Sequence, residues 1–173
     1  MALPQGWLTD AEWSWAQQHL PIACVDLVAI ETTNNAETRF GLIYRKAPTE
    51  QMMGWCLIGG RVLKGETLHS ELARHVTESL GDAIHLSVSP DAQPAYVAQY
   101  PHSTETNGPH DPRQQAIAST FVGHLHGEPA AMGEAEDFQW FTKHETQELV
   151  WGFGQRAVFE AAWARHLTLY KEV

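Results

Sequence analysis

The hydrophobic positions of this chain fall into short runs separated by polar turns, which predicts a sheet of several strands. Two early runs, PIACVDLVAIET and RFGLIYRKA, are rich in β-branched and apolar residues, and the turn TTNNAET between them predicts a hairpin. Later runs of the same character are AYVAQY, AIASTFVGHLHGE and EDFQWFT. The short run WCLIGG ends in two glycines, which we expect to form a loop before the next helix.

Three segments have the signals of helices. Thr9 and Glu12 form a capping-box pattern, which predicts a helix over residues 10–19. In ETLHSELARHVTESLG, apolar residues recur every four positions and mark a buried stripe: Leu68, Leu72, Val76 and Leu80. A C-terminal helix is expected at about 154–170. Helices around a mixed sheet indicate the α/β (α+β) class, with an α/β/α sandwich.

Length and charge narrow the picture further. The 173 residues fit a single domain over 1–173, in which residues 1–20 form an N-terminal helical extension. The net charge of -10 argues against nucleic acid or an anionic membrane as the main partner. Cys24 and Cys56 lie in apolar runs, as reduced buried thiols do. With no basic start and no run long enough to cross a bilayer, we expect a cytoplasmic protein.

The first helix and its approach carry an unusual number of tryptophans. Trp7, Trp13 and Trp15 present more aromatic surface than one short helix usually hides. Two interpretations stay open, which are docking of the helix on its own sheet and a homodimer interface.

The segment from Gly59 to Gly81 holds the candidate chemistry. Gly60 is followed after five residues by Glu66, after seven more by Arg74, and seven positions later by Gly81. This spacing resembles the Nudix box, the loop–helix signature of hydrolases that cleave nucleoside diphosphates linked to another group. The resemblance covers residues 60–82, about an eighth of the chain, and the order of the predicted elements agrees with the fold of that family.

The box departs from the family pattern at its carboxylates. The pattern continues after the arginine as R-E-U-x-E-E-x-G-U, with U apolar, whereas this chain has RHVTESLGD. His75 and Ser79 replace two of the three carboxylates, and only Glu78 matches. Mg²⁺ and Mn²⁺ prefer several hard oxygen ligands, and neutral imidazole is a poor substitute. The residues that shape the box are retained, while its catalytic part is degenerate.

The resemblance implies roles for further residues. Glu66 and Arg74 would pair and fix the loop onto the helix. A Mg²⁺ or Mn²⁺ ion would be held by Glu78, by the Gly59 carbonyl and by acids of a late loop, Glu134 and Glu136. Glu71, His75 and Glu78 can share one helix face. For His75 we consider a catalytic role or a solvated position, for Glu78 a metal ligand or a partner of Arg74, and for the two loop acids metal ligands or solvated side chains.

The stretch WCLIGGRVLKGETL is similar to the GDP-mannose mannosyl hydrolase branch of the family. That similarity implies a substrate-binding Asp26 near the nucleoside, and basic residues near the phosphates at Lys46 and Arg61. The dipeptide Pro112–Arg113 resembles a Pro-Arg loop of ADP-ribose-type members, which would place Arg113 on a phosphate or make it part of a plain turn.

Two functions follow as hypotheses. The first is a divergent, metal-dependent Nudix hydrolase acting on a nucleoside diphosphate linked to a sugar or another group. The second is a catalytically inactive Nudix-fold module that binds a nucleotide or phosphorylated sugar through Arg61, Lys46 and Arg113, without need of a metal.

Overall fold

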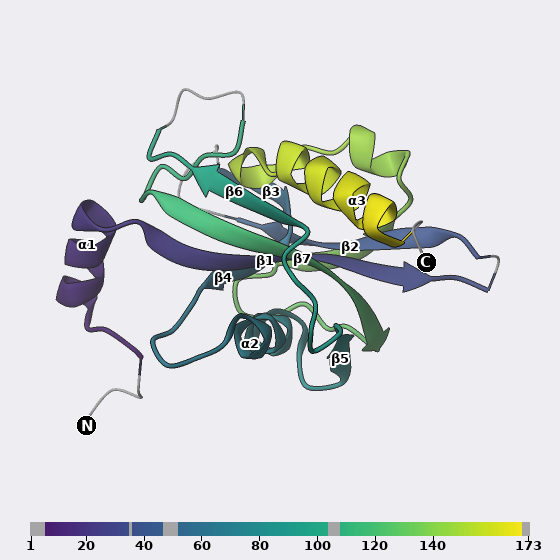
Figure 1. Cartoon of the computed structure of the whole chain (residues 1–173), viewed down its shortest axis with the longest axis horizontal. Helices are drawn as coiled ribbons and strands as arrows, with labels where there is room; N and C mark the ends of the chain where they lie inside the picture. The colour runs from purple at the N-terminus through teal and green to yellow at the C-terminus, as the bar shows by residue number, and fades with distance from the viewer. Residues whose placement is uncertain (1–5, 35, 47–51, 104–107, 171–173) are drawn as a thin grey trace.

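The chain folds around one mixed sheet with helices on both faces. The computed structural model describes residues 6–34, 36–46, 52–103 and 108–170. Within them the helix α2 (Leu68–Leu80) covers one face of the sheet, and α3 (Arg156–Tyr170) covers the other (Figure 1). The described strands are β1 (Ile22–Thr32), β2 (Thr38–Arg45), β3 (Gly54–Cys56), β4 (Ile58–Arg61), β5 (Ile84–Ser87), β6 (Tyr96–Tyr100), β7 (Ala116–Gly127) and β8 (Asp137–Phe141). The predicted fold class is confirmed.

The strands β1 and β7 run parallel at the centre of the sheet. Their register places Asp26 opposite Thr120 and Leu27 opposite Phe121. Leu27 and Val28 are successive residues and both are buried, so β1 is covered on both faces. This explains why the run CVDLVAI is almost continuously apolar rather than alternating. β2 pairs antiparallel with β1 and forms the predicted hairpin.

The helix α2 follows from local signals in its sequence. Thr67 caps its first turn by accepting from the backbone N–H of Ser70. Leu72, Val76 and Leu80 are buried against the sheet, as the four-residue spacing predicts. Gly81 ends the helix with a φ of 86°, a conformation that glycine adopts without strain.

The segment WCLIGG differs from the expectation of a single run followed by a loop. It divides into β3, which pairs with β2, and β4, which pairs with β1. Gly59 and Gly60 therefore lie inside the strand β4, opposite Asp26 and Val25. The short strand β5 was not predicted.

The remaining helices lie near their predicted positions. The helix α1 (Asp10–His19) begins at its Thr9 capping box, and residues 1–5 of the predicted extension lie outside the described part of the chain. Two 3-10 helices, η2 (Glu145–Gln147) and η3 (Gly152–Gly154), precede α3. Among the described helices, none combines the length and apolar character that a bilayer crossing needs.

Candidate functional site

A cavity of about 530 Å³ opens where the N-terminal extension, the sheet and the box helix α2 meet. Its volume is in the range of small-molecule sites. Most of the residues predicted for the site line it: Asp26, Gly59, Gly60, Arg61, Arg74, His75, Glu78, Arg113 and Glu134. Of the other predicted residues, Lys46, Glu66, Gly81 and Glu136 do not line this cavity.

Arg74 is the centre of the polar contacts in the box. Its Nε lies 3.2 Å from Oε2 of the fully buried Glu71, and its Nη2 also pairs with that oxygen. Nη1 donates to Oε2 of the half-exposed Glu78 at 2.8 Å. Nη2 donates in addition to the Arg61 carbonyl at 3.0 Å. The interpretation of Glu78 as a partner of Arg74 is confirmed.

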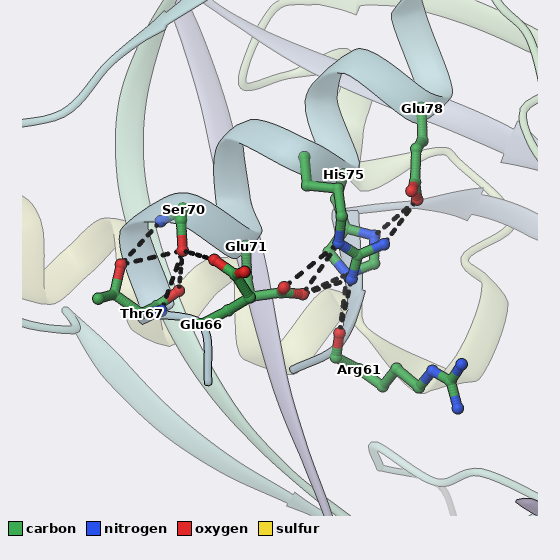
Figure 2. Close-up of polar contacts among 8 residues, drawn as sticks. Arg61, Glu66, Thr67, Ser70, Glu71, His75 and Glu78 are labelled. Atoms are coloured by element: carbon green, nitrogen blue, oxygen red, sulfur yellow. Dashed lines mark hydrogen bonds and ion pairs between the residues drawn. The ribbon is translucent and has the colours of Figure 1, made fainter. Parts of the chain in front are cut away.

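The predicted pair of Glu66 and Arg74 is wrong. Glu66 instead accepts a hydrogen bond from the Ser70 hydroxyl at 2.9 Å, near the first turn of α2 (Figure 2). Arg74 is drawn to Glu71 because that carboxylate lies three residues away on the same helix face, inside the protein. A buried carboxylate requires an opposite charge, so Glu71 determines where the arginine points.

His75 is buried rather than solvated, with only 8% of its surface exposed. Its ring packs on Gly60, where an added Cβ would lie 2.5 Å from the ring atom Cε1. The Nε2 atom lies 3.1 Å from the Arg61 carbonyl and 3.1 Å from Nη2 of Arg74. Burial and the Arg74 charge lower the pKa of His75, so the ring is neutral at pH 7.

The residues of the box, as placed, do not form a site for a divalent cation. Mg²⁺ and Mn²⁺ require several oxygen ligands turned toward one point. Here Glu71 and Glu78 both turn toward the Arg74 guanidinium, and His75 contributes a nitrogen. In the described residues, no three His, Cys, Asp or Glu side chains are grouped to hold a metal ion.

Arg61 reaches into the cavity between two aromatic rings of the N-terminal extension. Its guanidinium carbon lies 4.3 Å from the ring centre of Trp13 and 4.9 Å from that of Trp7. Figure 2 shows its side chain extending away from the cluster of Glu71, His75 and Glu78. No carboxylate among the described residues forms an ion pair with it, so its charge is available to an anion.

Two further arginines contact the ring of Phe153. The guanidinium carbons of Arg45 and Arg113 lie 5.2 and 5.3 Å from the centre of the Phe153 ring. Arg113 is held by two hydrogen bonds to Asp111, at 2.9 and 2.8 Å, and Arg45 pairs with Glu134. Phe153 has a φ of 55°, a conformation that a bulky residue rarely adopts and that is found at binding sites.

Lys46 and Glu136 lie apart from this group. Their charged atoms are 3.2 Å from each other, and both side chains are at least half exposed. Arg45, the last residue of β2, lines the cavity, whereas Lys46, just beyond the end of the strand, does not. The two acids of the late loop are therefore ion-paired rather than simply solvated: Glu134 pairs with Arg45, and Glu136 pairs with Lys46.

Asp26 lines the cavity and belongs to a buried hydrogen-bond chain. Tyr100 donates its hydroxyl to Oδ2 of Asp26 at 2.9 Å, and Gln155 donates to the Tyr100 oxygen at 3.2 Å. The pKa of Asp26 is raised to about 6, because burial raises it by more than the Tyr100 hydrogen bond and the Arg45 charge lower it. A buried, titratable carboxyl on a cavity wall is typical of functional sites.

Several cavity residues were not predicted from the sequence. Phe153, Tyr100 and Gln155 come from segments that carry no motif, and only the fold brings them to Asp26. The tryptophans could be noticed in the sequence by their density in and just before the first helix. That density was interpreted as packing on the sheet or as dimerisation. Strand alternation predicts that Arg45 and Lys46 point to opposite faces, but it does not say which of the two lines the cavity.

Solved structures share this fold at low sequence identity. A candidate asymmetric diadenosine tetraphosphate hydrolase from Jonesia denitrificans aligns with a TM-score of 0.72 and 23% identity, over 85% of this chain and 95% of that chain. The Nudix domain of Shewanella oneidensis NrtR, complexed with ADP ribose, gives 0.60 and 18%, over 91% and 99%. A MutT Nudix hydrolase from Burkholderia pseudomallei gives 0.57 and 24%, over 83% and 97%.

At this identity the likeness shows the fold alone, and the resemblance to the GDP-mannose branch stays a prediction. No curated protein matches the chain by sequence. A domain family, described as Domain of unknown function (DUF4916), matches residues 3–154. The match spans most of the 173 residues. The chain therefore belongs to this family, and its fold is that of the Nudix hydrolases.

Proposed function

We propose that the cavity binds a nucleoside diphosphate linked to a sugar or a similar group, and that the protein acts as a binding or regulatory module. The observation that carries this proposal is Arg61, a guanidinium on the cavity wall without an ion-pair partner among the described residues. A diphosphate supplies the negative charge and the hydrogen-bond acceptors that a guanidinium recognises.

The rest of the cavity supports the same class of ligand. Arg45 and Arg113 add positive charge on the side of Phe153, each balanced by one acid. Asp26 can accept a hydrogen bond from a hydroxyl or an amine of the nucleoside. The NrtR Nudix domain, which shares the fold, is complexed with ADP ribose, a ligand of this class.

Binding is favoured over hydrolysis because of Arg74. Metal-assisted attack on a diphosphate requires carboxylates that are available to the metal. Here one guanidinium engages both Glu71 and Glu78, and position 75 carries a buried neutral histidine. These contacts make the box a structural element that supports the cavity wall.

The second candidate is hydrolysis of the same ligand with Mg²⁺ or Mn²⁺. The observation that favours it is that Gly59, Glu78 and Glu134 line one cavity together with the diphosphate-binding arginines. In this candidate Glu78 and His75 are the catalytic residues, and Glu136 would have to leave Lys46 in order to join the ligands.

The test is calorimetric titration of the whole chain with ADP-ribose, GDP and GDP-mannose, in EDTA and in Mn²⁺. We expect binding in EDTA without release of product. R61Q removes a charged hydrogen-bond donor and should weaken the binding about 10- to 100-fold, corresponding to about 1.5–3 kcal/mol.

R165Q provides the matched control, because Arg165 is exposed on α3 and does not line the cavity. Its affinity should equal that of the wild type. Turnover in Mn²⁺ that is lost in E78Q would favour the second candidate. Equal affinity of R61Q and the wild type would contradict the proposed site.

A further inference from the structure

Arg74 has the surroundings that a metal ion would otherwise need. Its guanidinium contacts the Glu71 and Glu78 carboxylates and the backbone carbonyl of Arg61, which come from α2 and the end of β4. Two carboxylates and a backbone carbonyl are the hard oxygen ligands that Mg²⁺ and Mn²⁺ prefer. In this chain all three are directed at one guanidinium.

We propose that the guanidinium of Arg74 is the resident cation of the Nudix box in this protein, in place of a divalent metal ion. The inference rests on the proposed function and deepens it, because a site whose cation is covalently attached binds its diphosphate ligand without added metal. The site then binds the free diphosphate ligand in preference to the metal complex of that ligand.

The burial of Glu71 keeps Arg74 in place of a metal ion. Glu71 has no exposed surface, and a carboxylate in such a place needs an opposite charge at all times. Arginine stays protonated at every working pH, and its planar fork matches the carboxylate. A divalent ion would have to displace Arg74 from Glu71, and the partly buried guanidinium would then lose one of its two carboxylate partners.

The position of His75 fits the same arrangement. The ring occupies the space above Gly60, between α2 and β4, and contacts both Arg74 and the Arg61 carbonyl. A neutral ring there adds no charge to the cluster, in which the Arg74 guanidinium pairs with both Glu71 and Glu78. A carboxylate at position 75 would add a negative charge that Arg74 alone could not offset.

The experiment is a gain of metal binding. The full-length variant R74Q frees both carboxylates and the carbonyl, so it should bind Mn²⁺ at least about tenfold more tightly than the wild type, as measured by the loss of the free Mn²⁺ electron paramagnetic resonance signal. Mn²⁺ should also raise the Tm of R74Q and leave the wild-type Tm unchanged.

R74K is the matched control, because it keeps a positive charge near Glu71 and should bind Mn²⁺ as weakly as the wild type. The double variant E71Q/R74Q keeps Glu78 as the one carboxylate of the two that contact Arg74, and should lose the gained binding. Tight Mn²⁺ binding by the wild type that disappears in E78Q would overturn the proposal, and so would a folded R74Q without any gain.

If R74Q does not fold, ligand and metal binding by the wild type still test the proposal. Binding of ADP-ribose in EDTA with no Mn²⁺ retained supports the proposal, and retention of Mn²⁺ that depends on Glu78 overturns it. The proposed function fails separately: a wild type that binds none of the nucleotides, beside an R74Q that gains Mn²⁺, would leave Arg74 as the resident cation of a cavity with a different ligand.

Discussion

At the scale of single residues, Asp26 shows how burial converts an ordinary carboxyl into a sensitive group. The side chain is 5% exposed, and burial raises its pKa to about 6, from an ordinary value of 3.8. The Tyr100 hydroxyl stabilises the ionised form, but not enough to offset the loss of water. The sequence predicted Asp26 as a site residue through the family resemblance, but not its titration, which depends on Tyr100 and Arg45 from other strands.

The pH dependence of stability should reveal this carboxyl. Between about pH 4 and pH 6 the folded protein holds the Asp26 proton while the unfolded chain has released it, so the free energy of unfolding falls as the pH rises through this window. D26N keeps a carbonyl acceptor for Tyr100 but does not ionise. The difference in unfolding free energy, wild type minus D26N, should decrease by about 3 kcal/mol, at 1.36 kcal/mol per pKa unit, and level off above about pH 7.

Urea denaturation of both proteins at several pH values measures that difference. His75, whose lowered pKa gives a pH dependence of the opposite sign, contributes equally to both proteins and cancels. Parallel pH profiles would mean that Asp26 titrates as a solvated residue.

At the scale of elements, local signals predicted helices better than strands. The bounds of α1 were predicted at 10–19 because the Thr9 capping box marks its start within four residues and Pro21 follows its end. The Gly59–Gly60 part of β4 was expected to be a loop between a strand and the next helix. Its conformation comes from pairing with β1, more than thirty residues away along the chain, which no local pattern records.

Gly59 gives a test of that pairing. An added Cβ would lie 2.1 Å from the Val25 carbonyl oxygen and 2.7 Å from Oδ1 of Asp26, so β4 would have to move away from β1. G59A should lower the free energy of unfolding by about 1–3 kcal/mol. G108A is the control, because no described atom lies within 4 Å of its added Cβ, and it should change stability by less than about 0.5 kcal/mol. Equal stability of the two variants, measured in urea, would contradict the placement of Gly59 in the sheet.

At the scale of the whole molecule, the cavity exists only where distant parts of the chain meet. Trp7 and Trp13 come from the N-terminal extension, Arg61 from β4, and Phe153 from the segment before α3 (Figure 1). The box motif predicted the wall formed by α2 and β4, because its residues are neighbours along the chain. The opposite wall depends on how the extension folds back onto β4. The density of tryptophans in the sequence did not distinguish this packing from a homodimer interface. The homodimer stays a prediction.

Within α1, only the face that carries Trp13 should contribute to ligand binding. Trp13 stacks on Arg61, whereas Trp15, two positions further along the same helix, is 55% exposed and stacks on His19 instead. The Trp13 ring holds the Arg61 guanidinium in the cavity, and such a contact is worth about 0.5–2 kcal/mol. W13A should therefore weaken ADP-ribose binding about two- to thirtyfold, while W15A, which makes the same chemical change in the same helix, should bind like the wild type. Calorimetric titration in EDTA measures both affinities, and circular dichroism compares their helix content. If W15A lost as much affinity as W13A, the loss would come from the folding of the extension as a whole. Arg61 would then bind the ligand without a specific contribution from the Trp13 ring.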